Sequence, residues 1–68
     1  MELIFTYANK NRVAKVYTDP LTGYVVEYIM NGTIIRKTRH VELQLAESVA
    51  DDFIAEAGDS PSLLNETA

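Results

Sequence analysis

The side chains in this sequence that could do chemistry are few and scattered. His40 is the single histidine, and the chain has no cysteine. A histidine can act as an acid, a base or a metal ligand near neutral pH. Nucleophilic catalysis also needs a nucleophile held next to its base, and no serine stands in a recognisable motif. We therefore interpret His40 as a solvated residue at a strand end, and we predict no catalytic residue and no enzymatic activity.

Carboxylates gather in the segment that follows His40. Glu47 and Asp51 are four positions apart, so they would lie on one face of a helix and could approach a divalent cation together. The spacing of a calcium-binding loop is absent from the sequence. A solvated acidic face is the better interpretation. We expect no metal and no cofactor.

Residues 36–40 read Arg-Lys-Thr-Arg-His and form a short basic run. Alternate residues of a strand point to opposite faces, so the run does not make one patch. Part of it would share a face with tyrosines, and cations mixed with aromatic rings are typical of proteins that bind single-stranded nucleic acid. The alternative is that the tyrosines belong to the core. The nucleic-acid face would comprise Tyr17, Tyr24, Tyr28, Lys37 and Arg39.

The net charge of the chain opposes nucleic acid as the main partner. Ten acidic residues stand against six basic ones, which gives a formal net charge of −4. Domains that bind nucleic acid are usually basic. We keep nucleic-acid binding as the second hypothesis.

Two turn sequences indicate the element that must position these side chains. Asn31-Gly32 is the strongest short signal for a type I′ hairpin, because both of its central residues need a positive φ. Residues 19–23, Asp-Pro-Leu-Thr-Gly, form a second turn, with Pro20 presetting φ. β-branched and aromatic residues flank both turns. The pattern predicts four antiparallel strands over residues 2–8, 12–18, 24–30 and 33–40.

The Asn-Gly turn also predicts the strand register. A two-residue loop places Glu27 opposite Arg36 and Tyr28 opposite Ile35. If the Asp-Pro loop has four residues, Val16 lies opposite Glu27. One face of the sheet then holds Val13, Lys15, Tyr17, Tyr24, Val26, Tyr28, Met30, Ile35 and Lys37. The other holds Ala14, Val16, Val25, Glu27, Ile29, Ile34, Arg36 and Thr38.

After the sheet, the spacing of apolar residues becomes helical. An alanine-rich amphipathic helix is predicted at about 43–57, starting between 41 and 46, with Gly58 as its stop. One helix covers only one face, and its small side chains favour the face with the large tyrosine and methionine residues. The other face would expose an aliphatic patch, which is typical of an interaction surface. That predicted interaction surface comprises Val16, Val25, Ile29, Ile34 and Arg36.

The chain is therefore predicted to be an α+β protein: a four-stranded antiparallel β-meander, one C-terminal amphipathic helix and a mobile tail. We expect one domain over residues 1–58 and a flexible tail over 59–68. A chain of 68 residues without disulfides is marginally stable alone, which favours a homo-oligomer or a protein partner. The sequence contains neither a signal peptide nor a run long enough to span a membrane, so we expect a cytoplasmic protein.

Several short stretches resemble a known group of proteins. They are Lys-Val-Tyr-Thr-Asp at 15–19, Gly-Tyr-Val-Val at 23–26, Asn31-Gly32, His40 and the segment Ala-Glu-Ser-Val-Ala-Asp-Asp-Phe-Ile at 46–54. Over about residues 12–57, the chain resembles small uncharacterised proteins of tailed phages that infect marine cyanobacteria. The resemblance implies a virus-encoded accessory protein that acts in the cytoplasm of a host cell. Together with the predicted aliphatic patch, it leads us to expect a second copy of the chain, or a host or phage protein, as the partner. It assigns a role to no residue.

Overall fold

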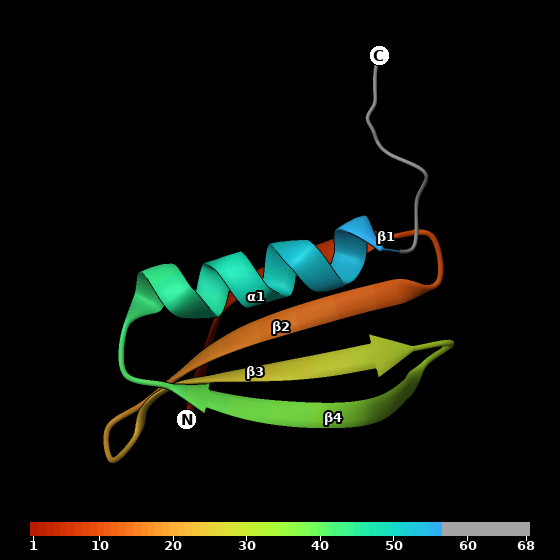
Figure 1. Cartoon of the computed structure of the whole chain (residues 1–68). Helices are drawn as coiled ribbons and strands as arrows, with labels where there is room; N and C mark the ends of the chain where they lie inside the picture. Colours follow the sequence, from red (N-terminus) through yellow and green to blue (C-terminus); the bar gives the residue numbers. More distant parts are fainter. Residues whose placement is uncertain (57–68) are drawn as a thin grey trace.

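The structure is a computed structural model, and it describes residues 1–56. Four strands form one antiparallel sheet in the order β1-β2-β3-β4, and a helix follows them (Figure 1). The elements are β1 (Glu2–Asn9), β2 (Arg12–Asp19), β3 (Gly23–Met30), β4 (Thr33–His40) and α1 (Leu43–Ala55). The predicted fold class is confirmed. The predicted tail at 59–68 lies outside the described residues, as does Gly58.

The Asn-Gly turn has the predicted backbone geometry. Asn31 has a φ of 54° and Gly32 a φ of 81°, which are the two positive values that a type I′ turn requires. The turn between β1 and β2 lies at the same end of the sheet. The amide of Asn31 donates to the carbonyl of Asn11 over 2.9 Å, so the two turns hold each other.

The register between β2 and β3 differs from the prediction by one residue. Asp19 pairs with Gly23 rather than Tyr24, so the loop has three residues instead of four. The carboxylate of Asp19 accepts a hydrogen bond from the amide of Leu21 over 2.8 Å, which tightens the loop. Gly23 closes it with a φ of 99°, a conformation that glycine adopts freely. Val16 consequently lies opposite Val26, not opposite Glu27.

A β-bulge changes the register between β3 and β4. Ile29 pairs with Ile34 as predicted, but Tyr28 pairs with Arg36, so Ile35 is the extra residue. Beyond the bulge every β4 residue is shifted by one, because two residues of β4 oppose one of β3. Glu27 therefore lies opposite Lys37, and the predicted pair with Arg36 is wrong.

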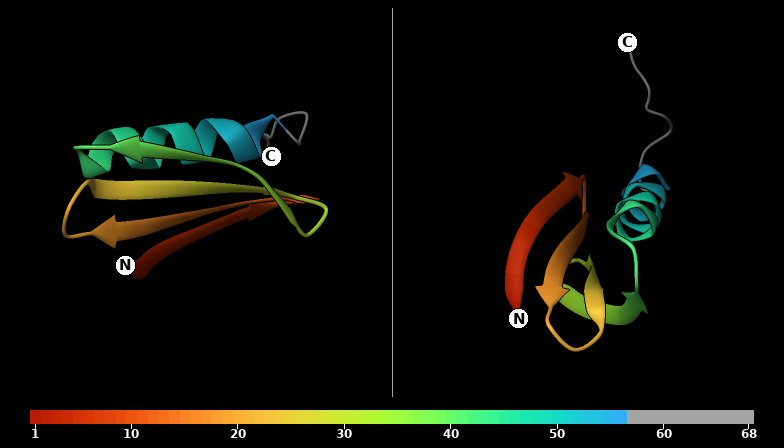
Figure 2. Two further views of the ribbon diagram at one scale, coloured as in Figure 1. Left: turned by 90° about the horizontal axis from the view of Figure 1, so that it is seen from below. Right: turned by 90° about the vertical axis from the view of Figure 1, so that its left-hand side faces the viewer.

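The core lies between the sheet and α1, which runs across one face of the sheet (Figures 1 and 2). Ala46 and Ala50 of the helix are fully buried, and their small side chains let α1 approach the strands closely. From β3, the residues under the helix are those of the predicted face, including Val26 and Tyr28. From β2 they are Ala14 and Val16, and the prediction of Val13, Lys15 and Tyr17 there is wrong because of the register shift.

The helix begins and ends close to the predicted positions. Glu42 is the N-cap residue and makes no side-chain capping bond. The last turn of the helix is held by side chains from β1 and β2. The Asn9 amide donates to the carbonyl of Ile54 over 2.8 Å. Arg12 donates to the carbonyl of Phe53 over 3.2 Å, placing a positive charge where helix carbonyls are unpaired. Within residues 1–56, no helix has the length and apolar character to cross a membrane.

Candidate functional site

The structure does not bring the predicted interaction surface together. Val16 lies under the helix and is fully buried, and Arg36 belongs to the same helix-covered side of the sheet. Val25 lies on the helix-free face but is only 3% exposed, with Tyr17 and Arg39 as its cross-strand neighbours. Of the aliphatic residues predicted to be exposed there, Ile34 is half exposed and Ile29 is partly buried. The prediction of a continuous aliphatic patch across β2, β3 and β4 is therefore wrong.

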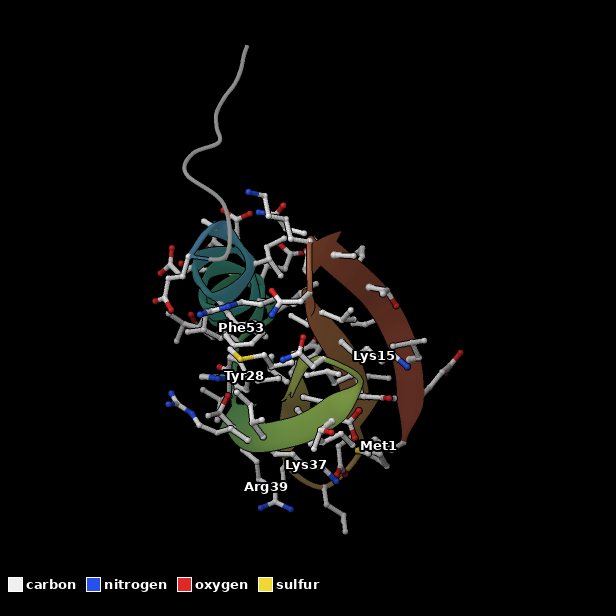
Figure 3. All side chains as sticks on the ribbon, turned by 90° about the vertical axis from the view of Figure 1, so that its right-hand side faces the viewer. Met1, Lys15, Tyr28, Lys37, Arg39 and Phe53 are labelled. Atoms are coloured by element: carbon white, nitrogen blue, oxygen red, sulfur yellow. The ribbon has the colours of Figure 1, made fainter. Side chains whose placement is uncertain are left out.

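The predicted nucleic-acid face is also divided between two sides. Tyr28 packs edge-on against Phe53 of the helix, with ring centroids 5.0 Å apart, and Tyr24 packs against the same core. Lys37 and Arg39 point to the other side of the sheet (Figure 3). The tyrosines of β3 thus serve the core, and the sheet itself separates them from Lys37 and Arg39, which share the helix-free face with Tyr17.

A polar cluster occupies the centre of the helix-free face. Glu27 is 8% exposed, and its two cross-strand neighbours are Lys15 and Lys37. Tyr17 donates a hydrogen bond to this carboxylate over 2.9 Å, and the ammonium of Lys37 lies 3.5 Å from it. Burial raises the pKa of Tyr17, and the bond to Glu27 adds to the rise. The cluster explains why this face is not a continuous apolar surface.

A hollow of about 320 Å³ lies between β4 and α1. Its floor contains a chain of hydrogen bonds: the hydroxyls of Tyr28 and Thr38 are 2.9 Å apart, and the Thr38 hydroxyl is 2.8 Å from Nε2 of His40. The guanidinium of Arg36 lies over the ring of Tyr28, 5.1 Å from its centroid. His40 is thus half-buried and hydrogen-bonded, not a freely solvated strand end. The wall on the helix side includes Val49, Phe53 and two acidic residues, Asp52 and Glu56.

The helical carboxylates that the sequence singled out lie on the opposite flank of α1. Glu47 and Asp51 border a shallow hollow beside Tyr7 of β1. Burial raises the pKa of Tyr7, and the charges of these two carboxylates raise it further. In the described part of the chain, no cluster of three or more histidine, cysteine or acidic side chains could hold a metal ion.

Both outer strands of the sheet have an unpaired edge, and the two edges differ in chemistry. From Leu3 to Asn9, β1 carries no charged residue. Its large exposed apolar side chains are Leu3 at 46%, Ile4 at 36% and Phe5 at 39%. By contrast, β4 carries Arg36, Lys37 and Arg39 within four residues. The predicted β-meander implies that the first and last strands lie at the edges, and the sheet order places β1 and β4 there. Both surfaces predicted from the sequence lie on faces of the sheet, so neither was defined by these edges.

Each edge strand contains one bulge, at Ile4 in β1 and at Ile35 in β4. Beyond its bulge each strand is regular, over residues 5–9 and 36–40 respectively. These regular segments are the parts that could pair with another chain, since bulges interrupt the ladder of backbone hydrogen bonds.

Comparisons of the chain with known protein families, with curated proteins and with solved structures gave no match. The two open edges and the hollow beside β4 are accordingly the features from which a function can be argued.

Proposed function

We propose that this protein is a protein–protein interaction module rather than an enzyme, and that its first partner is a second copy of itself, paired through β1. The observation that carries the proposal is the contrast between the two open edges. An unpaired edge is a template for another strand, and proteins usually blunt it with charged side chains. Such charges are present on β4 and absent from β1 between Leu3 and Asn9.

Pairing of two β1 strands is compatible with symmetry. Two antiparallel strands at the centre of a dimer are related by a two-fold axis, so each copy presents the same segment to the other. Such pairing brings Phe5, Thr6 and Tyr7 of one copy close to the same residues of the next. This pairing places no like charges opposite each other. It would also remove from water part of the surface of Leu3, Ile4 and Phe5, which are 36–46% exposed.

Pairing of two β4 strands is disfavoured by the same reasoning. An antiparallel pair centred on residues 36–39 places basic side chains next to basic side chains across the axis. Like charges directly opposite each other destabilise a strand pair. A joined sheet through β1 would have eight strands, which lies within the usual range of sheet sizes.

The test is the oligomeric state of two matched variants. Thr6→Lys places a lysine in the middle of the β1 edge, and Thr33→Lys makes the same substitution on β4; both threonines are exposed. Sedimentation velocity over a range of micromolar concentrations measures the mass, for which a monomer is 7.6 kDa. We expect the parent protein and Thr33→Lys to form dimers and Thr6→Lys to be monomeric.

Circular dichroism should show that both variants are folded, because neither side chain is in the core. A parent protein that remains monomeric throughout the concentration range would overturn the proposal of self-association. Dimers that persist equally in both variants would show that the contact surface is elsewhere than β1.

A further inference from the structure

The hollow beside β4 exists because the helix is displaced from this strand. Helix α1 packs most extensively on β2 and β3 and least on β4. The helix-facing residues of β4, which include Arg36 and Thr38, therefore form an open floor instead of being covered. Ile35, which is 53% exposed, adds an apolar side chain at the bulge, and Val49 and Phe53 add apolar surface from the helix.

The outer edge of β4 runs along this hollow, and its basic side chains alternate between the two faces of the sheet. Lys37 and Arg39 lie on the helix-free face, whereas Arg36 lies on the side of the hollow. In the described part of the chain, Arg39 has no acidic side chain within ion-pair distance, whereas Lys37 lies 3.5 Å from Glu27 and Arg36 lies over the ring of Tyr28. Unpaired basic groups on an open strand edge are suited to carboxylates from another chain.

From this arrangement we propose that β4 and the hollow bind an extended peptide in which acidic and apolar residues alternate. The peptide would add to the sheet as a fifth strand next to β4. Side chains of a strand alternate between faces, so one set would enter the hollow and the other would lie over the helix-free face. The apolar set fits the side with Ile35, Val49 and Phe53, and the acidic set fits the side with Lys37 and Arg39.

The acidic residues of the helix do not cancel the attraction between the basic side chains of β4 and an acidic peptide. An added strand lies about 4.8 Å from β4, so the basic side chains of β4 are its direct cross-strand neighbours. Asp52 and Glu56 stand on the opposite wall of the hollow, on the helix. Glu56 is in addition paired with Arg12, whose guanidinium is 2.9 Å from its carboxylate. The nearer charges are therefore positive.

The alternative to peptide binding is that the basic side chains of β4 serve only to prevent edge pairing. The presence of the hollow favours peptide binding over edge protection. A protected edge needs charges alone, and it does not need a neighbouring apolar depression. The proposed site lies on β4, whereas self-association was assigned to β1, so either proposal can fail while the other stands.

A fluorescence-anisotropy titration with labelled peptides tests the inference. The probe is a short peptide of alternating valine and glutamate. One control peptide replaces glutamate by lysine, and a second has the valine and glutamate composition of the probe arranged in two blocks. Titrations use the parent protein and Thr6→Lys, so that the result does not depend on dimer formation. We expect saturable binding of the alternating acidic peptide alone, weakening as salt is added.

Two exposed residues of the site, Arg39 and Ile35, are substituted to test it. Arg39→Glu should weaken binding by roughly five- to tenfold, because attraction becomes repulsion between cross-strand neighbours. Its matched control is Lys10→Glu, which makes the same change of charge in the β1–β2 turn. Ile35→Ser should weaken binding through the hollow, and its control is Leu21→Ser in a loop where the side chain is 92% exposed.

The outcomes are distinct. Equal weakening by Arg39→Glu and Lys10→Glu would mean that the peptide senses only net charge, and the site would be wrong. Binding of the block peptide as tight as that of the alternating one would rule out an added strand. No binding of the probe by either the parent or Thr6→Lys would overturn the inference and leave the basic residues as edge protection.

Discussion

The two glycines of the hairpins provide a matched test of the register. Both have a positive φ, 99° at Gly23 and 81° at Gly32. A β-carbon on Gly32 would meet nothing within 4 Å, whereas one on Gly23 would lie 2.8 Å from the carbonyl oxygen of His40. Real β-carbons essentially never approach a backbone oxygen so closely, and a backbone carbonyl cannot rotate away as a side chain can. Alanine at the two positions should therefore have unequal effects.

The loss in the free energy of unfolding can be estimated for each variant from separate contributions. Alanine at a positive φ costs about 1–3 kcal/mol of folding free energy. Alanine has less conformational freedom than glycine in the unfolded chain, and this difference stabilises the folded state by about 0.4–1 kcal/mol. Gly32→Ala should thus lower the free energy of unfolding by roughly 1–2 kcal/mol. Gly23→Ala carries the same terms and in addition an overlap with the backbone at His40 and Val41, for which about 1–3 kcal/mol is typical of overpacking.

Urea unfolding followed by far-ultraviolet circular dichroism measures both variants. A core of this size supplies about 3–5 kcal/mol, so Gly23→Ala should be close to unfolded at room temperature, and the titration should start at low temperature or with a stabilising osmolyte. Equal losses of stability in the two variants would refute the reasoning. The close approach of Gly23 to the end of β4 would then be absent in solution, and with it the pairing of Tyr24 with His40.

Two further predictions concern stability. Arg12→Met should lower the free energy of unfolding by about 1–2 kcal/mol, because the end of the helix loses the bonds from the guanidinium to Phe53 and Glu56; unchanged urea unfolding and unchanged hydrogen exchange in the last helical turn would contradict it. The backbone hydrogen bond from Leu21 holds the pKa of Asp19 below its ordinary value of 3.8. A lowered pKa in the folded state means that this carboxylate stabilises the protein above its unfolded-state pKa and loses that effect as the pH falls through the folded-state pKa. Asp19→Asn keeps an acceptor oxygen and should therefore reduce the loss of melting temperature between neutral and strongly acidic pH, and an unchanged loss would show that other groups cause it.

The strand boundaries were predictable because they depend on local chemistry. Asn31-Gly32 and the Asp-Pro loop are turn sequences whatever the rest of the chain does. The side of β3 under the helix was predictable for a similar reason, since the alternation of Tyr24, Val26 and Tyr28 is counted within a single strand. The helix followed from the change of apolar spacing, but its start could be predicted only to within residues 41–46, because the N-cap residue Glu42 makes no side-chain capping bond that would mark it.

The register could be predicted only in part. A positive φ at Gly23 is compatible with either loop length, because this glycine would end a loop over residues 20–23 and begins β3 after the observed loop over residues 20–22. The sequence therefore contained a signal for the turn but not for its length. The bulge at Ile35 had no such signal. Charge pairing could not reveal it, because Glu27 finds a basic residue opposite with the bulge or without it: Lys37 in one case and Arg36 in the other.

One-residue shifts matter for function because the side-chain period of a strand is two. A shift of one position moves every later residue of that strand to the other face. A surface composed across several strands, such as Val16 with Val25, cannot survive an error of this kind. A property of a single edge strand does survive it, since a partner strand adds in the plane of the sheet and meets both alternating sets of side chains. The basic run of β4, which is divided when viewed on the faces of the sheet, is therefore continuous for a strand that pairs with its edge, and the uncharged segment of β1 is continuous in the same sense.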